Sequence, residues 1–264
     1  MTTVSDVIAF LEKFAPPFLA EDWDNVGLLV GRHDLPLNRV MTCLTLTPDV
    51  AKEAVDRHVN MVVSHHPVLF RGVKQMTDAS QEGRMLLTLI ENRIAIYCPH
   101  TCFDSAAPGI NQQLAETLGL TQIQPIRPIP EMENIGGGRM GNLPAPTTLR
   151  MFMATARQCV AAPYLEYVGA LTANVSLVAV ACGAAAEFLA DAMRLGCDTF
   201  VTGEARFHTA LEARAAGINL VLLGHYSSER PAMQRLADTL ATEFPGLETF
   251  ASLVEQDPLS MFTG

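Results

Sequence analysis

The sequence has little that would place it in a membrane or on a nucleic acid. Although 49% of its residues are hydrophobic, no stretch reaches the roughly 20 consecutive apolar residues that a membrane-spanning helix needs. The first residues, MTTVSDVIAFLEKFAPP, lack a basic start followed by an apolar core, so we expect no signal peptide. Lys and Arg number 18 against 28 Asp and Glu, for a net charge of −10. An acidic chain without a Lys/Arg cluster repels phosphate backbones, which disfavours nucleic-acid binding.

The sequence also has no CxxC motif, and its six cysteines are not spaced as in a disulfide-rich domain. In a chain of 264 residues this indicates reduced thiols and a cytoplasmic location. Low-complexity tracts are missing as well. The length fits one large domain or two ordinary ones, at roughly 100–200 residues per domain.

What the sequence does contain is an alternation of short apolar runs with helix-like segments. Strands are predicted over residues 39–45, 60–64, 94–98, 176–181, 199–203 and 219–223. Helices are predicted over residues 50–59, 81–92, 107–118, 184–195, 209–216 and 228–244. This rhythm of near-continuous apolar strands and helices favours an α/β fold with largely parallel sheets.

The stretch over residues 121–148 interrupts this rhythm. It holds several prolines and the run GGGRMG, and it is therefore predicted to be a domain junction. We expect an N-terminal α/β domain over residues 1–128 and a C-terminal α/β domain over residues 129–264. The last helix is a candidate to pack back on the first domain.

Four predicted strands end in polar clusters, in the segments MVVSHHP, IAIYCPHTCFD, TFVTGEARFH and INLVLLGHYSSE. Ligands of parallel α/β sheets bind beyond the carboxyl ends of the strands, so these clusters are candidates to converge. Adjacent strand residues point to opposite faces. His65 and His66 can therefore converge only where the strand ends, and Pro67 frees that backbone from the sheet. Five of the seven histidines lie at such ends, which favours a metal site.

His100 and Asp104 are four residues apart, as are His225 and Glu229. On a helical turn this spacing puts both side chains of a pair on one face. Imidazole with carboxylate is a usual ligand set for Zn, Fe, Mn or Ni. Two such ions roughly 3.5–4 Å apart can activate a water and stabilise a leaving oxygen. Taken alone, each pair is more simply a solvated pair.

Other polar residues in these segments leave alternatives open. Cys98 and Cys102 flank His100 and offer thiolates for zinc, but Cys98 is more simply a small buried residue at a strand end. Glu204 is either a cap or a functional group. His208 either supports the site or packs.

Two further features are expected to be structural or solvent-facing. The segment EDWDNVGLLVG, residues 21–31, is predicted to be a structural turn in which the single Trp23 is a packing anchor. His33 and His58 lie beside charged residues and are expected to face solvent.

Together and in this order, the segments resemble the Nif-three-like family, the Ngg-one-interacting-factor-three relatives often labelled GTP cyclohydrolase 1 type 2 homologues. The resemblance covers nearly the whole chain through WDNVGLLVG, VVSHHPVLF, HTCFDSAAPGIN, GGGRMG, FVTGEARFH and LLGHYSSE. It implies two similar three-layer α/β domains with a dinuclear metal centre in the cleft between them. It also implies a homo-oligomer in the form of a hexameric ring.

By this resemblance the metal ligands are His65, His66, Asp104, His225 and Glu229. One ion takes His66 and Asp104, the other takes His65 and His225, and Glu229 bridges them. His100 lies close by and either handles protons or holds substrate. The resemblance thus implies two divalent transition metal ions per chain, with Zn, Fe, Mn and Ni all open.

The leading hypothesis is a metal-dependent hydrolase that acts on a small-molecule substrate of unknown identity. The second hypothesis is a non-catalytic protein that stores, delivers or senses metal, or a scaffold that presents a partner surface. Tight metal retention with weak, slow turnover would favour the second hypothesis.

Overall fold

The computed structural model describes residues 1–262, which form two compact units. Unit 1 comprises Met1–Phe103 and Ala232–Gln256, and unit 2 comprises Asp104–Pro231 with the chain from Asp257 onward. The divisions fall inside the helices α4 (His100–Ser105) and α9 (His225–Glu243). The domain bounds expected from the sequence, 1–128 and 129–264, stay a prediction. Across residues 1–262 no helix combines the length and apolarity that crossing a membrane requires.

Unit 1 is built on a five-stranded sheet with the order β1-β4-β3-β2-β13. Its strands are β1 (Gly27–Val30), β2 (Arg39–Cys43), β3 (Met61–Ser64), β4 (Ala95–Cys98) and β13 (Glu248–Ala251). The strands β13, β2, β3 and β4 pair in parallel, and β1 is antiparallel to β4. Every residue of β3 and β4 is buried, which is why both strands appear in the sequence as continuous apolar runs.

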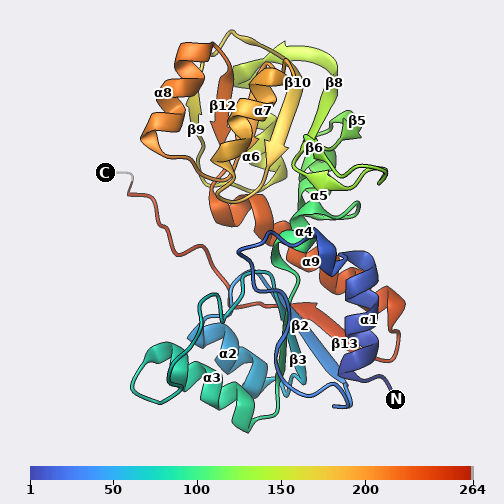
Figure 1. Ribbon diagram of the computed structural model, residues 1–264. Coiled ribbons are helices and arrows are strands. Elements are labelled where there is room, and N and C mark those ends of the chain that lie inside the picture. Colours follow the sequence, from blue (N-terminus) through green and yellow to red (C-terminus); the bar gives the residue numbers. More distant parts are fainter. Residues whose placement is uncertain (263–264) are drawn as a thin grey trace. The chain divides into compact units, whose positions relative to one another are not determined.

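Helices cover both faces of this sheet. The helices that lie wholly in unit 1 are α1 (Val4–Phe14), the 3-10 turn η1 (Pro17–Leu19), α2 (Pro48–Asp56) and α3 (Gln81–Glu91). The helices α2 and α3 share a core with one face, and α1 lies on the other side of the sheet (Figure 1). The end of α9 packs beside α1, where the rings of Phe10 and Phe244 meet edge-on at 5.7 Å. Unit 1 is therefore three-layered.

Local capping groups fix where these helices begin. Thr3 and Asp6 form a capping box at the start of α1. The side chain of Thr47 caps α2, with Pro48 in the first turn, and that of Ser80 caps α3.

Unit 2 is built on a six-stranded sheet with the order β5-β8-β10-β11-β12-β9 and a separate two-stranded ribbon, β6-β7. The strands are β5 (Thr121–Gln124), β6 (Arg127–Pro128), β7 (Gly136–Gly137), β8 (Arg139–Thr148), β9 (Glu166–Val168), β10 (Asn174–Ala181), β11 (Thr199–Thr202) and β12 (Asn219–Leu222). The central strands β10, β11 and β12 are parallel, and the outer strands are antiparallel to their neighbours.

The helices that lie wholly in unit 2 are α5 (Ile110–Thr117), α6 (Leu149–Cys159), the 3-10 turn η2 (Ala186–Phe188), α7 (Leu189–Arg194) and α8 (Phe207–Ala216). The helices α7 and α8 share a core with Ala179, Phe200 and Leu220 of the sheet. The helices α5 and α6 pack against β8 and β10. Both units thus combine helices with sheets, which confirms the α/β class.

Each predicted strand and helix overlaps an observed one. The segment over residues 121–148, expected as a junction, instead carries β5 to β8. The helix expected from residue 228 begins three residues earlier, at His225. The sequence did not predict α1, α4, α6, β1, β9 or β13. The strand β1 lies in the segment over residues 21–31 that was expected to be a structural turn.

The GGGRMG run holds a fully buried arginine. Arg139 has no exposed surface, and its guanidinium donates hydrogen bonds to the carbonyls of Gly136, Gly138 and Ala106 at 2.7, 2.7 and 2.8 Å. It also donates to the side-chain oxygen of Gln112 at 3.0 Å. Burial lowers the pKa of Arg139 to about 10. The side chain therefore joins the ribbon of unit 2 to the segment that follows α4.

Replacing this buried cross-link should destabilise the protein. In Arg139→Met several buried carbonyls lose their donor, and each unsatisfied group costs about 1–3 kcal/mol. We expect the free energy of unfolding, measured by urea denaturation, to fall by about 3 kcal/mol. The control Arg150→Met removes an exposed arginine from α6 and should change it by less than about 0.5 kcal/mol. Equal stability of the two variants would contradict this role of Arg139.

Candidate metal centre

The histidine pair follows β3 because parallel pairing continues past the end of the strand. The N–H of His65 donates to the Cys43 carbonyl at 2.9 Å, and the N–H of His66 donates to the Leu44 carbonyl at 2.8 Å. On the other side, the Cys98 thiol donates to the His65 carbonyl at 3.0 Å. Both backbones are thereby held at the carboxyl edge of the sheet. The His65 side chain is buried, and that of His66 is half-buried.

A third imidazole joins them from the end of β4. His100 opens α4 with a backbone φ of 25°, a sparsely populated conformation for a residue other than glycine. Its ring centroid lies 5.2 Å from that of His65 and 5.8 Å from that of His66, and the latter two are 5.1 Å apart. One ring nitrogen from each lies within 4.8 Å of the other two. Unit 1 therefore presents three imidazoles that could hold a metal ion.

Oxygen atoms orient two of these rings. Thr45 Oγ1 lies 2.7 Å from His66 Nδ1, and Asp24 Oδ1 lies 2.7 Å from His100 Nδ1. With Nδ1 engaged, Nε2 is the nitrogen through which each ring would bind a metal. Burial raises the pKa of Asp24, but hydrogen bonds from His100 and Thr101 outweigh it and lower that pKa to about 2. Asp24 is thus an ionised partner of His100 at neutral pH.

In unit 2, the first turn of α9 brings an imidazole and a carboxylate together. His225 Nε2 lies 3.0 Å from Glu229 Oε2, as the four-residue spacing predicts. His225 Nδ1 lies 3.1 Å from Glu204 Oε1. The hydrogen bond with Glu229 raises the pKa of His225, burial opposes this, and Glu204 adds to the rise, to about 9. Glu204 therefore contacts the candidate ligand His225, whereas His208 is exposed.

Asp104 lies close to Glu229 in unit 2, with a carboxylate oxygen of each within 4.8 Å of the other. The Cys182 thiol donates to Asp104 Oδ1 at 3.3 Å. Burial, followed by the charges of Asp104 and Glu229, raises the pKa of Cys182 well above its usual value, so the thiol stays protonated. Asn111 donates to the Asp104 carbonyl at 3.1 Å and accepts from the Cys182 N–H at 2.8 Å. These contacts fix the backbone and one carboxylate oxygen of Asp104.

A glycine keeps room for the His225–Glu229 pair. Gly183 has a φ of +63°, and a Cβ there would lie 2.1 Å from Glu229 Oε1 and 3.4 Å from His225 Nε2. Its N–H donates to Ser228 Oγ at 3.0 Å. Any other residue would strain the backbone and displace the carboxylate. The space reserved here fits a site at which Glu229 must keep one position.

The donor atoms of each unit fit a divalent transition metal. Unit 1 offers three imidazoles, and unit 2 offers one imidazole and two carboxylates, which is the chemistry that Zn, Fe, Mn and Ni share. That His65, His66, Asp104, His225 and Glu229 together ligate two ions stays a prediction.

The structure decides several of the alternatives that the sequence left open. The Cys98 thiol donates to a carbonyl, and burial raises its pKa above the usual range, so it is a small buried residue and not a zinc thiolate. His33 and His58 are exposed, as expected. The expectation that Trp23 is a packing anchor is wrong, because its side chain is 58% exposed.

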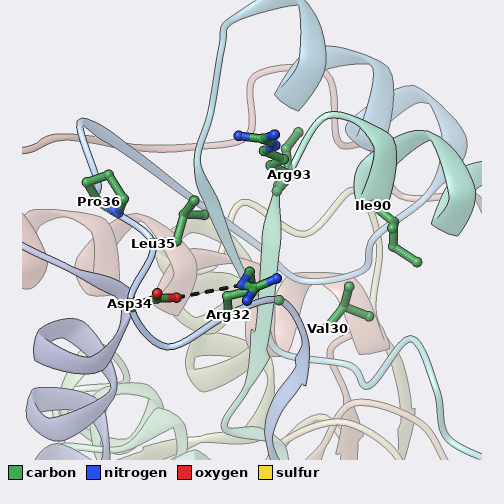
Figure 2. A pocket seen from close by; sticks show the side chains of 9 residues that line it. Val30, Arg32, Asp34, Leu35, Pro36, Ile90 and Arg93 are labelled. Carbon is green, nitrogen blue, oxygen red and sulfur yellow. Dashed lines mark ion pairs between the residues drawn. The ribbon is translucent and has the colours of Figure 1, made fainter.

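Unit 1 also has a hollow of about 650 Å³ that is separate from the candidate metal ligands. It is lined by Val30, Gly31, Arg32, Asp34, Leu35, Pro36, Ile90, Arg93 and Ile94 (Figure 2). The ion pair between Arg32 and Asp34 spans 3.8 Å with both side chains largely exposed, so solvent screens it. None of the candidate ligands lines this hollow.

The fold and the donor atoms define an α/β protein with side chains suited to a divalent metal. More specifically, the chain belongs to the Duf34/NIF3 (NGG1p interacting factor 3) family, whose model matches residues 2–258. The resemblance predicted from the sequence motifs is thereby confirmed.

Relatives and solved structures agree along nearly the whole chain. A protein of Clostridium perfringens named GTP cyclohydrolase 1 type 2 homolog is 30% identical over 97% of this chain and 98% of its own length. The Protein NIF3 homolog of Schizosaccharomyces pombe is 32% identical over 95% of each chain. The crystal structure of the Staphylococcus aureus protein SA1388 has a TM-score of 0.91 at 27% identity and covers 99% of each chain. Reduced HcgD from Methanocaldococcus jannaschii has a TM-score of 0.82 at 25% identity and covers 95% of this chain and 97% of its own.

Removing the hydroxyl of Thr45 should weaken metal binding. In Thr45→Val the ring of His66, a proposed ligand, loses the partner of its Nδ1 atom, and losses of this kind cost about 10–100-fold in metal affinity. We expect such a loss for Zn²⁺, measured by competition with a chromophoric chelator. The control Thr88→Val changes an exposed threonine of α3 and should bind Zn²⁺ like the wild type. Equal affinities in all three proteins would show that Thr45 does not orient a ligand.

Adding a side chain at Gly183 should lower the free energy of unfolding by more than backbone strain alone would. Gly196 also has a positive φ, +76°, but a Cβ there meets nothing within 4 Å. Gly196→Ala should therefore cost about 1 kcal/mol of unfolding free energy, from strain only. Gly183→Ala should cost about 2 kcal/mol more, because Glu229 must move. Urea denaturation of both variants measures the difference, and equal losses would refute the steric argument.

Proposed function

We propose that this protein binds divalent transition metal ions and is a metal-dependent hydrolase. The observation that carries the proposal is the group of three imidazoles in unit 1, whose ring nitrogens lie within 4.8 Å of one another. Imidazoles gathered so closely, with Asp24 and Thr45 holding two of their Nδ1 atoms, are typical of metal sites. The names of the relatives as GTP cyclohydrolase 1 type 2 homologs support a hydrolytic activity.

The finer proposal is a dinuclear centre. It assigns His66 and Asp104 to one ion, His65 and His225 to the other, and Glu229 as the bridge between them. Family membership supports it, as does the room that Gly183 leaves for the Glu229 carboxylate. Ions bound there would supply Lewis acidity and an activated water for hydrolysis. The native ions are Zn, Fe, Mn or Ni.

Within this proposal His100 carries a proton. Asp24 Oδ1 at 2.7 Å from His100 Nδ1 favours the tautomer with the proton on Nδ1, which leaves Nε2 as the basic nitrogen. Because the pKa of Asp24 is about 2, this carboxylate stays ionised and stabilises the imidazolium that forms when Nε2 accepts a proton. His100 can therefore take a proton from a nucleophile and return it to a leaving group.

The assembly and location of the protein are part of the same proposal. We expect a homo-oligomer, as a hexameric ring, that acts on a small-molecule substrate in the cytoplasm. Family membership supports the ring, and a cysteine pattern without disulfide spacing supports the compartment. The net charge of −10 counts against nucleic acid as the substrate.

Counting metal ions tests the proposal. After reconstitution with Zn²⁺, Mn²⁺, Fe²⁺ or Ni²⁺, elemental analysis of the wild type should give about two ions per chain. His66→Ala/Glu229→Ala should give near none, because each half of the ligand set loses a donor. A screen of hydrolase substrates should then show turnover in the wild type that the double variant lacks.

The control variant is His33→Ala/His58→Ala, which removes two exposed histidines and should keep the metal count. No metal in the reconstituted wild type would overturn the proposal. Two tightly held ions without turnover would favour a protein that stores, delivers or senses metal.

A further inference from the structure

Two large aromatic side chains are exposed beside His65, His66 and His100, the histidine cluster of unit 1. Trp23 is 58% exposed and Phe70 is 48% exposed. Their ring centroids lie 5.8 Å apart with the planes tilted by 55°. The same two centroids lie 5.9 and 6.4 Å from that of His100, both nearly edge-on. Leaving these rings in water forfeits the stabilisation that burying them would give.

A loose backbone does not account for this exposure. Asp24, next to Trp23, is hydrogen-bonded to His100 at 2.7 Å. Asn25 Nδ2 donates to the Leu69 carbonyl at 2.6 Å, which ties the turn that carries the first ring to the residue before the second. The two segments are therefore fixed to each other and to the imidazoles. The rings are held at the cluster and remain open to a ligand.

We propose that Trp23 and Phe70 bind the flat aromatic ring of a ligand whose polar group is bound at the histidine cluster. The inference rests on the proposed metal function and names the class of molecule that the site takes. Aromatic rings attract one another in offset or edge-on arrangements with centroids about 4.5–7 Å apart. A saturated ring of the same size gains contact area but lacks this attraction. The pair therefore selects a planar aromatic ring over an aliphatic one.

The test compares two probes that share one metal-binding group, benzohydroxamate and cyclohexanecarbohydroxamate. Both are titrated into metal-loaded protein by calorimetry, with the metal count taken before and after. Trp23 is the only tryptophan in the chain, so its fluorescence reports directly on a ring that binds against it. The variants are Trp23→Leu, Trp23→Phe and Phe70→Leu, with Phe18→Leu as a control because Phe18 is 59% exposed.

We expect the wild type to bind benzohydroxamate roughly three- to tenfold more tightly than its saturated counterpart. Binding should change the Trp23 emission. The preference should disappear in Trp23→Leu and weaken in Phe70→Leu. It should survive in Trp23→Phe, which keeps an aromatic face, and in Phe18→Leu.

Equal affinities for the two probes with a normal metal count would overturn this inference and leave the proposed function standing. A preference that persists in Trp23→Leu, or an unchanged Trp23 emission, would overturn it as well. Equal affinities together with a change of oligomeric state in Trp23→Leu would show instead that Trp23 and Phe70 form an interface between copies of the chain. A metal count near zero in the wild type would overturn the proposed function and this inference together.

Discussion

β3 pairs in parallel with β2 on one side and with β4 on the other, so all three strands end at the same edge of the sheet. The histidine cluster of unit 1 depends on this register. His65 and His66 follow β3, His100 follows β4 after one proline, and main-chain hydrogen bonds to the end of β2 hold the pair in place. A slip of one residue would turn every side chain of β3 to the opposite face.

Polar side chains that are taken out of water need partners, because an unsatisfied buried group is costly. The two units meet this need in a similar way. In unit 1 Asp24 and Thr45 engage the Nδ1 atoms of His100 and His66. In unit 2 Glu204 engages the Nδ1 of His225. Each contact orients its ring through Nδ1 and leaves Nε2 as the nitrogen that could bind a metal.

The sequence predicted the elements whose pattern is local, such as the buried strands β3 and β4 and the helix α2. It also predicted that His225 and Glu229 share a helical face, because a four-residue spacing needs only a helical turn. It missed α1 although Thr3 and Asp6 form a capping box there. It missed β13 because that strand exists only through pairing with β2, some 200 residues away in the chain. The prolines and glycines of residues 121–148 suggested a junction, yet Arg139 and the antiparallel pairing of β8 order this stretch.

By itself, the sequence determined the α/β class, the family and the candidate ligands, since apolar periodicity and motifs at strand ends are properties of short segments. Only the tertiary structure showed that Asp24 contacts His100 and that Glu204 and Cys182 contact candidate ligands. It alone showed that Gly183 reserves space for Glu229 and that Trp23 is exposed beside His100. Each of these facts depends on atoms that are brought together from distant parts of the chain by sheet register and by buried hydrogen bonds. The spacing of residues along the sequence does not predict these distances in space.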